Sequence, residues 1–465
     1  MVQILISIGT QLNSLWTEPD YKPPFDLNSF LNAIFELIIS DNRLFSYEAI
    51  QLWISLMGNQ HLQTNPTIVQ ATINLSNIMT NSKLLFKINP DNYLDEFNSE
   101  EDFRRFSQKY RNDLAKLIKL STRLYLEHYL TAAFEWAAKI IYETKPNDQS
   151  GYDPNSFLYM CWDAVLFLWT SIMQAIGKTV KEKSFKNESE MNFIKEKLIS
   201  LISLCVKFNC ANANYCSFNF SLQSTIIVSC ELENTEVILE TILGKLFGDF
   251  ILFQNKYIEL DAEGKTDAQI LKSIQNLRKQ IAANILNICR SYASKIMKDF
   301  EEIYTKCMTL INNTHSTSIE RVIFIQSLIF CNNENNSYAA QSAFIEQFLR
   351  PIYEFFLSQE FQASVQNVEM FIKFVGLNES LPDPNTLQNR RQIFFYLNVL
   401  FAILKSVKAN DETLNQSHFA FASFMKIFEP LLQFIKCLNA IHSPDAKSKL
   451  NPEFLEMTEA AKTLG

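Results

Sequence analysis

Glycine and proline are scarce in this sequence, in which 465 residues include 9 glycines and 13 prolines. Glycine usually accounts for about 7% of residues, and sheet proteins and Gly-rich nucleotide loops need it for tight turns and close backbone approach. The scarcity favours helices joined by short polar loops. The sequence also lacks GxxxxGK[ST], GxGxxG, GxSxG and HExxH motifs. We therefore predict no catalytic residues, no cofactor and no enzymatic activity.

An excess of positive charge is also missing. The formal net charge is −8 and the pI is about 5.4, whereas a nucleic-acid-binding domain usually has a strongly basic surface. Any contact with RNA therefore has to come from a local basic stripe on an acidic molecule. The acidic balance also suits basic protein partners.

Metal-ligand spacing is absent from the nine cysteines and five histidines. The closest cysteines, Cys205, Cys210 and Cys216, have neither CxxC spacing nor a nearby histidine. Most cysteines stand in apolar helical stretches, so we expect no metal site and reduced, buried thiols typical of the cytosol or nucleus.

Long apolar runs are missing too. No run approaches the 18 or so residues that a membrane span needs. The apolar start, Met1–Gly9, has no basic residue and is followed by a polar stretch from Gln11. We expect a core helix there rather than a signal peptide, and a soluble intracellular protein without membrane insertion.

The apolar residues that are present recur with helical spacing almost throughout. Clear stripes lie within Phe45–Leu56, Ile274–Ile288 and Phe421–Leu438, and only Ser224–Ser229 resembles a short strand. We predict about eighteen helices in nine pairs, and HEAT units have about 40 to 47 residues each. Because no pair can bury its apolar face alone, the pairs must stack. The predicted fold is all-α, an α-solenoid of HEAT-type antiparallel helix pairs, as a single array over residues 1–465.

Basic pairs on two predicted helices are the candidate binding residues. Arg278 and Lys279 share a helix with Arg290, and Arg390 and Arg391 open another. Arginine can donate two hydrogen bonds to one phosphate, and a helix can present such side chains in a row. The alternative for each residue is an ordinary solvated helix face. These five residues are the candidate RNA contacts.

An acidic triplet, Glu100–Asp102, directly precedes Phe103. It could bind a metal or basic cargo, but acidic residues also favour the first turn of a helix because of the helix dipole, and we predict a helix start. Arg104, Arg105 and the basic residues as far as Arg111 on this helix allow the same two interpretations as the candidates above.

Several stretches, in order, resemble the exportin-5 family of importin-β-type receptors. They are Asn98-Ser-Glu-Glu-Asp-Phe103 with Phe106, Arg111 and Trp136; Leu277 to Arg290, a double-basic helix ending in Cys-Arg; Phe356-Leu-Ser-Gln-Glu360 with Phe371-Ile-Lys-Phe-Val-Gly376 and Asn389-Arg390; and Leu431-Leu432 with Asn439, Ile441, Ser443-Pro444 and Leu464-Gly465. The matches keep the family's order at roughly its spacing over nearly the whole chain. The loop from Lys408 to Phe419 is shorter than in the family.

The resemblance implies nuclear export, with RanGTP, of hairpin RNA such as microRNA precursors, and of tRNA and protein cargo in some members. It implies nucleoporins as partners and shuttling between nucleus and cytoplasm. The chain corresponds to a middle portion of the family, whose Ran-binding N-terminal repeats and C-terminal repeats have no counterpart here. The alternative is a HEAT-repeat scaffold for protein complexes without transport activity.

Overall fold

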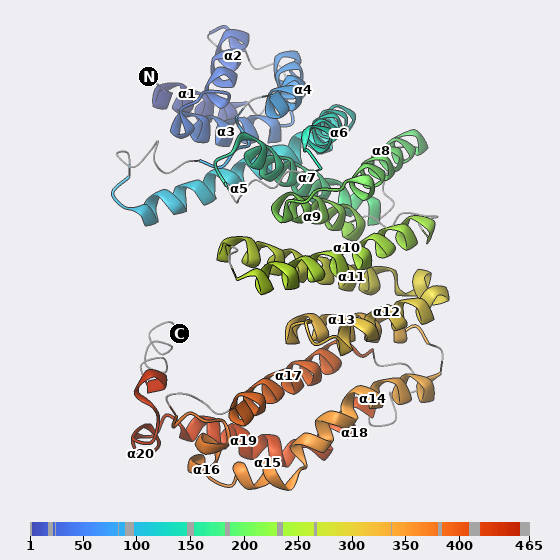
Figure 1. Ribbon diagram of the computed structural model, residues 1–465. Helices are drawn as coiled ribbons and strands as arrows, with labels where there is room; N and C mark the ends of the chain where they lie inside the picture. Colours follow the sequence, from blue (N-terminus) through green and yellow to red (C-terminus); the bar gives the residue numbers. More distant parts are fainter. Residues whose placement is uncertain are drawn as a thin grey trace. The chain divides into compact units, whose positions relative to one another are not determined.

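A computed structural model describes residues 2–16, 22–23, 25–81, 83–88, 97–146, 153–181, 187–229, 236–264, 267–335, 337–379, 384–408 and 419–455. Over these residues it contains twenty α-helices, one short 3-10 helix and no strand (Figure 1). The all-α prediction is confirmed. Ser224–Ser229, the one strand candidate, lies in a helix.

The chain divides into two compact units. Unit 1 is Met1–Thr235 with Glu263–Gln280, and unit 2 is Glu236–Ala262 with Ile281–Gly465. The prediction of one array over residues 1–465 stays a prediction.

Unit 1 consists of two layers of helices. Its helices are α1 (Val2–Leu15), α2 (Leu27–Ile38), α3 (Arg43–Gly58), α4 (Pro66–Asn81), α5 (Glu100–Leu124), α6 (Leu126–Glu143), α7 (Phe157–Lys181), α8 (Glu188–Lys207) and α9 (Ala213–Ser229), followed by the first part of α11 (Ala268–Ile296). The odd-numbered helices α1 to α9 pack one on the next, and so do the even-numbered helices α2 to α8. This is the stacking of helix pairs that the sequence predicts.

Unit 2 is built in a similar way, with shorter helices toward its end. It contains α10 (Glu236–Glu263), the rest of α11, the 3-10 helix η3 (Met297–Asp299), α12 (Phe300–Asn312), α13 (Ser318–Asn332), α14 (Tyr338–Phe356), α15 (Gln359–Ser364), α16 (Val368–Phe374), α17 (Pro384–Ser406), α18 (Phe419–Lys426), α19 (Phe428–Ala440) and α20 (Pro444–Lys447). Helix α13 packs on both α12 and α17, and α16 packs on α19. Phe356 and Phe361 are fully buried in the resulting core.

Short polar side chains set many of the helix starts. The Ser99 hydroxyl accepts a hydrogen bond from the Asp102 backbone N–H at 3.1 Å and donates to the Asp102 carboxylate at 2.9 Å. Glu100, Glu101 and Asp102 therefore form the capped first turn of α5, as predicted. At α13, Thr317 and Glu320 form a capping box.

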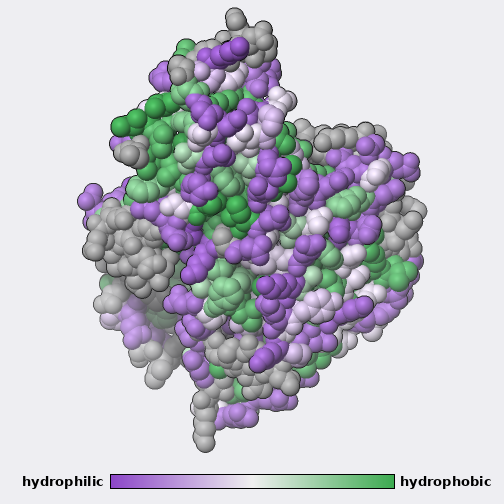
Figure 2. All heavy atoms as spheres, turned by 90° about the horizontal axis from the view of Figure 1, so that it is seen from above, coloured by the Kyte–Doolittle hydropathy of each residue, from purple (hydrophilic) through white to green (hydrophobic). Residues whose placement is uncertain are grey.

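The N-terminal helix differs from the core helix that we expected. Only Gly9 and Leu12 of α1 are buried, while Ile4, Ile8 and Leu15 are exposed. Gly9 allows α1 to approach α3, because a Cβ atom at this position would overlap Leu52. Figure 2 looks onto this end of unit 1, and green apolar residues gather on the side where Figure 1 draws α1.

The three apolar stripes have different outcomes. The apolar residues of the Ile274–Ile288 stripe on α11 are buried, as predicted. Those of the Phe45–Leu56 stripe on α3 are buried except for Phe45, which is 41% exposed. In the Phe421–Leu438 stripe the helical period is right, but only part of it faces the core. Leu431 is buried there, whereas Phe421 is 56% exposed and Ile435 is 51% exposed.

Helix α7 contradicts the expectation that no apolar run approaches a membrane span. Its segment Phe157–Gly177 is 21 residues long and apolar enough to cross a membrane by length and composition, and 67% of its most apolar window is buried inside the protein. The Trp162 indole donates to Thr144 Oγ1 at 3.0 Å, and the Trp169 indole donates to the Ala133 carbonyl at 3.2 Å. This burial and these contacts are typical of a core helix.

Thiol burial agrees with the prediction. Seven of the eight described cysteines are buried, and Cys210 is half-buried; Cys230 lies outside the described residues. Burial raises the pKa of the Cys205 thiol well above its ordinary value.

The core predicts a clear contrast between two phenylalanines of unit 2. Replacing the fully buried Phe361 by alanine should cost about 3–5 kcal/mol of stability, because it removes a large side chain and leaves a cavity. The control Phe421→Ala, on an exposed position, should change stability by less than about 1 kcal/mol. The urea midpoint of the helical circular-dichroism signal measures both. Equal shifts would contradict the assignment of the core.

Candidate nucleic-acid interface

The structure places the five candidate basic residues in different environments. Three of them lie on α11 and two lie on α17. Their exposure and contacts decide which of them can meet a phosphate.

Arg278 is in the interior, which corrects its assignment as an RNA contact. Its side chain is 1% exposed and is one of the largest fully buried side chains of the protein. The reason is the helical period, because Ile274, Leu277 and Ile281 bury the same face of α11. A phosphate cannot reach the guanidinium in this conformation. The spacing of the apolar residues already places Arg278 on the buried face of α11, and the sequence analysis missed this.

Lys279 follows Arg278 and is half-buried. The next residue, Gln280, fixes this part of α11 to α9 within unit 1. It accepts a hydrogen bond from Ser217 Oγ at 2.5 Å and donates another to Ser221 Oγ. Lys279 therefore lies on a backbone that is held in place, with part of its side chain open to solvent.

Arg290 is exposed near the end of α11, in unit 2. Its guanidinium lies 5.0 Å from the ring centroid of Phe330 on α13. Such a cation–π contact orients the planar group and leaves its N–H edges free to bind oxygen ligands. The fold therefore sets the orientation of the exposed Arg290 guanidinium in advance.

Arg390 has a structural role that the sequence analysis missed. It donates to the carbonyl of Gly376 at 2.6 Å and also to that of Val375, and its guanidinium lies 4.9 Å from the Phe454 ring centroid. The neighbouring Asn389 side chain donates to Phe374 O at 3.0 Å. Two donors of Arg390 are thus engaged with the end of α16, and burial lowers the pKa of its guanidinium.

Gly376 shows why these two segments of the chain meet. Its φ is +64°, a conformation that favours glycine, and a Cβ atom here would lie 2.6 Å from Thr386 Oγ1. The chain can therefore leave α16 close to the start of α17. Arg391, next to Arg390, is exposed to solvent.

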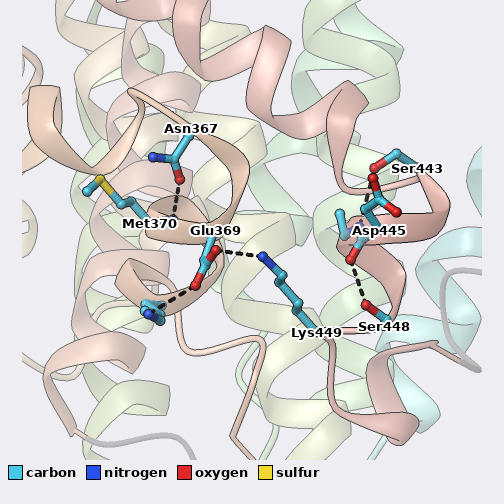
Figure 3. A network of polar contacts seen from close by, with 9 residues as sticks. Asn367, Glu369, Met370, Ser443, Asp445, Ser448 and Lys449 are labelled. Carbon is cyan, nitrogen blue, oxygen red and sulfur yellow. Dashed lines mark hydrogen bonds and ion pairs between the residues drawn. The ribbon is translucent and has the colours of Figure 1, made fainter.

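A second set of contacts attaches the C-terminal segment to α16 (Figure 3). Glu369 accepts from Lys449 Nζ at 2.6 Å and from Lys373 Nζ at 3.3 Å. The hydrogen bond from Lys449, followed by that from Lys373, lowers the pKa of the Glu369 carboxyl. The Asn451 N–H donates to the Leu377 carbonyl at 2.9 Å. Lys449 and Asn451, which follow α20, thus tie the C-terminal segment to the start of α16 and to the residues that follow its end.

Some basic residues of α5 are paired with carboxylates, and others are exposed to solvent. Arg111 pairs with Asp163 at 3.0 Å and covers the Phe167 ring at 4.3 Å, and Arg105 pairs with Glu101 at 2.5 Å. Arg104 and Lys109 are exposed. Within the described ranges, no group of three or more His, Cys, Asp and Glu side chains could hold a metal ion.

The stacked helix pairs define this chain as a helical-repeat protein of the HEAT type. The profile of the Exportin-5 family matches residues 1–464, and the chain belongs to that family. Mouse Exportin-5 is 20% identical over 518 residues, and human Exportin-5 is 22% identical. Each alignment covers 100% of this chain and 41% of the relative, so the chain spans less than half the length of these relatives.

Solved structures of the karyopherin Kap121p resemble this chain. Kap121p bound to Nup53p has a TM-score of 0.43, and Kap121p bound to the extreme C-terminus of the protein phosphatase Cdc14p has a TM-score of 0.42. Both are 11% identical, and each alignment covers 96% of this chain and 42% of the Kap121p chain.

Arg390 and Arg391 provide a matched pair for a test. Arg390→Lys loses the forked geometry that reaches the Val375 and Gly376 carbonyls, so it should weaken the attachment of α17 to the end of α16 by about 1–3 kcal/mol. Arg391→Lys, on the exposed neighbour, should change this attachment little. Hydrogen exchange of residues 375–377 reports the difference. Identical protection in the two variants would show that Arg390 does not hold this junction.

Proposed function

We propose that this chain is part of a nuclear export receptor that carries hairpin RNA and protein cargo to the cytoplasm with RanGTP. The observation that carries the proposal is the Exportin-5 family match over residues 1–464. Nucleoporins as partners and shuttling between nucleus and cytoplasm belong to the same proposal. The absence of enzymatic activity stays a prediction, and membership of a family of transport receptors supports it.

The RNA part of the proposal rests on exposed or half-exposed cations. With Arg278 buried and two donors of Arg390 engaged, the remaining candidates are Lys279, Arg290 and Arg391. Such side chains would bind the phosphate backbone and thereby the A-form shape of double-stranded RNA rather than its base sequence. The net charge of −8 makes long-range attraction poor, so the binding should be weak and local.

Within unit 2, both exposed arginines lie on helices that contact α13. The Arg290 guanidinium lies over the ring of Phe330 on α13. Helix α13 also packs on α17, the helix of Arg391. Gln326 and Asn333, on either side of Phe330, donate hydrogen bonds to Ser406 at the end of α17, whereas Arg391 lies near its start. Arg290 and Arg391 are therefore two separate exposed cations of one unit, and the test replaces both.

The test is the salt dependence of hairpin RNA binding by the 465-residue chain. Each neutralised phosphate contributes a slope of about 0.7 to 0.9 in log affinity against log salt. Arg290→Glu with Arg391→Glu should weaken binding to all hairpins alike and reduce the slope by about 1.4 to 1.8.

The control is Arg104→Glu with Lys109→Glu, which makes the same change in net charge on exposed positions of α5. The control should have a much smaller effect on affinity and slope. If the two double variants behave identically, general charge rather than these two arginines governs binding, and the RNA assignment fails.

A further inference from the structure

Helix α17 has an unusual charge for this acidic protein. Its 23 residues, PNTLQNRRQIFFYLNVLFAILKS, include Arg390, Arg391 and Lys405 and no carboxylate. The chain as a whole carries 50 acidic and 42 basic residues. A partner of negative charge would therefore be attracted to this helix while the rest of the protein repels it.

The same helix exposes a row of apolar side chains. Phe394 is 53% exposed, Phe401 is 64% exposed and Leu404 is 44% exposed. With the half-buried Leu397, they are spaced by three, four and three residues, which is the a and d pattern of a coiled-coil seam. Another face of α17, on which Ile393, Leu400 and Ile403 are buried, packs in the core of unit 2. Leu397 packs partly against that core, and the other three side chains of the row are exposed.

Cations flank this row at the positions that select partners in coiled coils. Arg391 and Lys405 are both exposed and lie fourteen residues apart, one row beside the apolar seam, with Asn398 midway between them. Lys405 Nζ lies 5.6 Å from the Phe401 ring centroid. In the heptad these three residues take the e position, where opposite charges on the partner set its identity and orientation.

We propose that this face of α17, Arg391 to Lys405, is the docking site for an acidic amphipathic helix of a protein partner. At 1.5 Å per residue the site is about 21 Å long, so it fits a partner helix of about four turns. The partner presents apolar side chains at a and d and Asp or Glu at e and g, and it lies along α17 with its apolar face inward.

Other occupants fit the surface less well. In an antiparallel pair with a second copy of α17, Arg391 and Lys405 would meet like charges. RNA would find cations and two exposed rings, but Leu397 and Leu404 offer no ring on which a base can stack. The proposal is argued from α17 alone and does not rest on the proposed export function, but it shares Arg391 with the proposed RNA contacts, and the tests below distinguish the two ligands.

The apolar part of the site is tested with a fluorescein-labelled helical peptide of eighteen residues that has leucine at a and d and glutamate at e and g. The 465-residue chain should bind it, as measured by fluorescence anisotropy. Phe394→Gln with Phe401→Gln should weaken binding at least tenfold, because two large apolar side chains are lost from the contact. Ile435→Gln, on an exposed apolar residue of α19 that is 51% exposed, should leave binding unchanged.

The charges are tested by a swap that also controls for misfolding. Arg391→Glu with Lys405→Glu should weaken binding of the glutamate peptide at least tenfold and strengthen binding of a matched peptide with lysine at e and g. A variant that is unfolded would not gain affinity for the lysine peptide.

Three results would overturn the proposal. The first is no binding of the glutamate peptide by the unsubstituted chain, or equal loss with Ile435→Gln. The second is a dimer in analytical ultracentrifugation that Phe394→Gln with Phe401→Gln dissociates, which would assign the face to a second copy. The third is displacement of the peptide by hairpin RNA together with retention of RNA binding in the phenylalanine variant, which would assign the cations to RNA.

Discussion

The structure depends on one constraint, which is that a single helix pair cannot bury its own apolar face. In unit 1 the odd-numbered helices from α1 to α9 form one layer and the even-numbered helices from α2 to α8 form the other. Each helix from α3 to α7 is thus covered by the helices two places before and after it in the chain. This arrangement explains why α7 can be long and apolar, with Trp162 and Trp169 fully buried, and it leaves α1 with exposed isoleucines on its outer side.

The same constraint sorts the arginines by helical period. On α11, Arg278 falls on the face that Ile274 and Ile281 bury, whereas Arg290 falls outside it and lies over Phe330. On α17, Arg390 reaches the carbonyls that end α16, and Arg391 points to solvent. Arg278 and Arg390 therefore have structural roles, whereas Arg290 and Arg391 are exposed. Only the exposed arginines are available to a ligand.

The sequence predicted the fold class and much of the core, because helical spacing and scarce glycine are local properties. The buried face of α11 and the capped start of α5 follow directly from the pattern. The role of Arg390 could not be predicted in the same way, since its partners Val375, Gly376 and Phe454 lie far away along the chain. The exposed half of the Phe421–Leu438 stripe was missed because the helical period does not say which of two apolar faces a neighbour covers.

The chain belongs to the Exportin-5 family, and we propose that it acts in transport rather than as a static scaffold. Movement between nuclei in fused cells measures this directly, with the tagged protein followed from a donor nucleus into an acceptor nucleus while protein synthesis is blocked. The account predicts that the tag reaches the acceptor nucleus and that the transfer stops when the RanGTP gradient is collapsed. Retention in the donor nucleus, or transfer that ignores the Ran gradient, would contradict it.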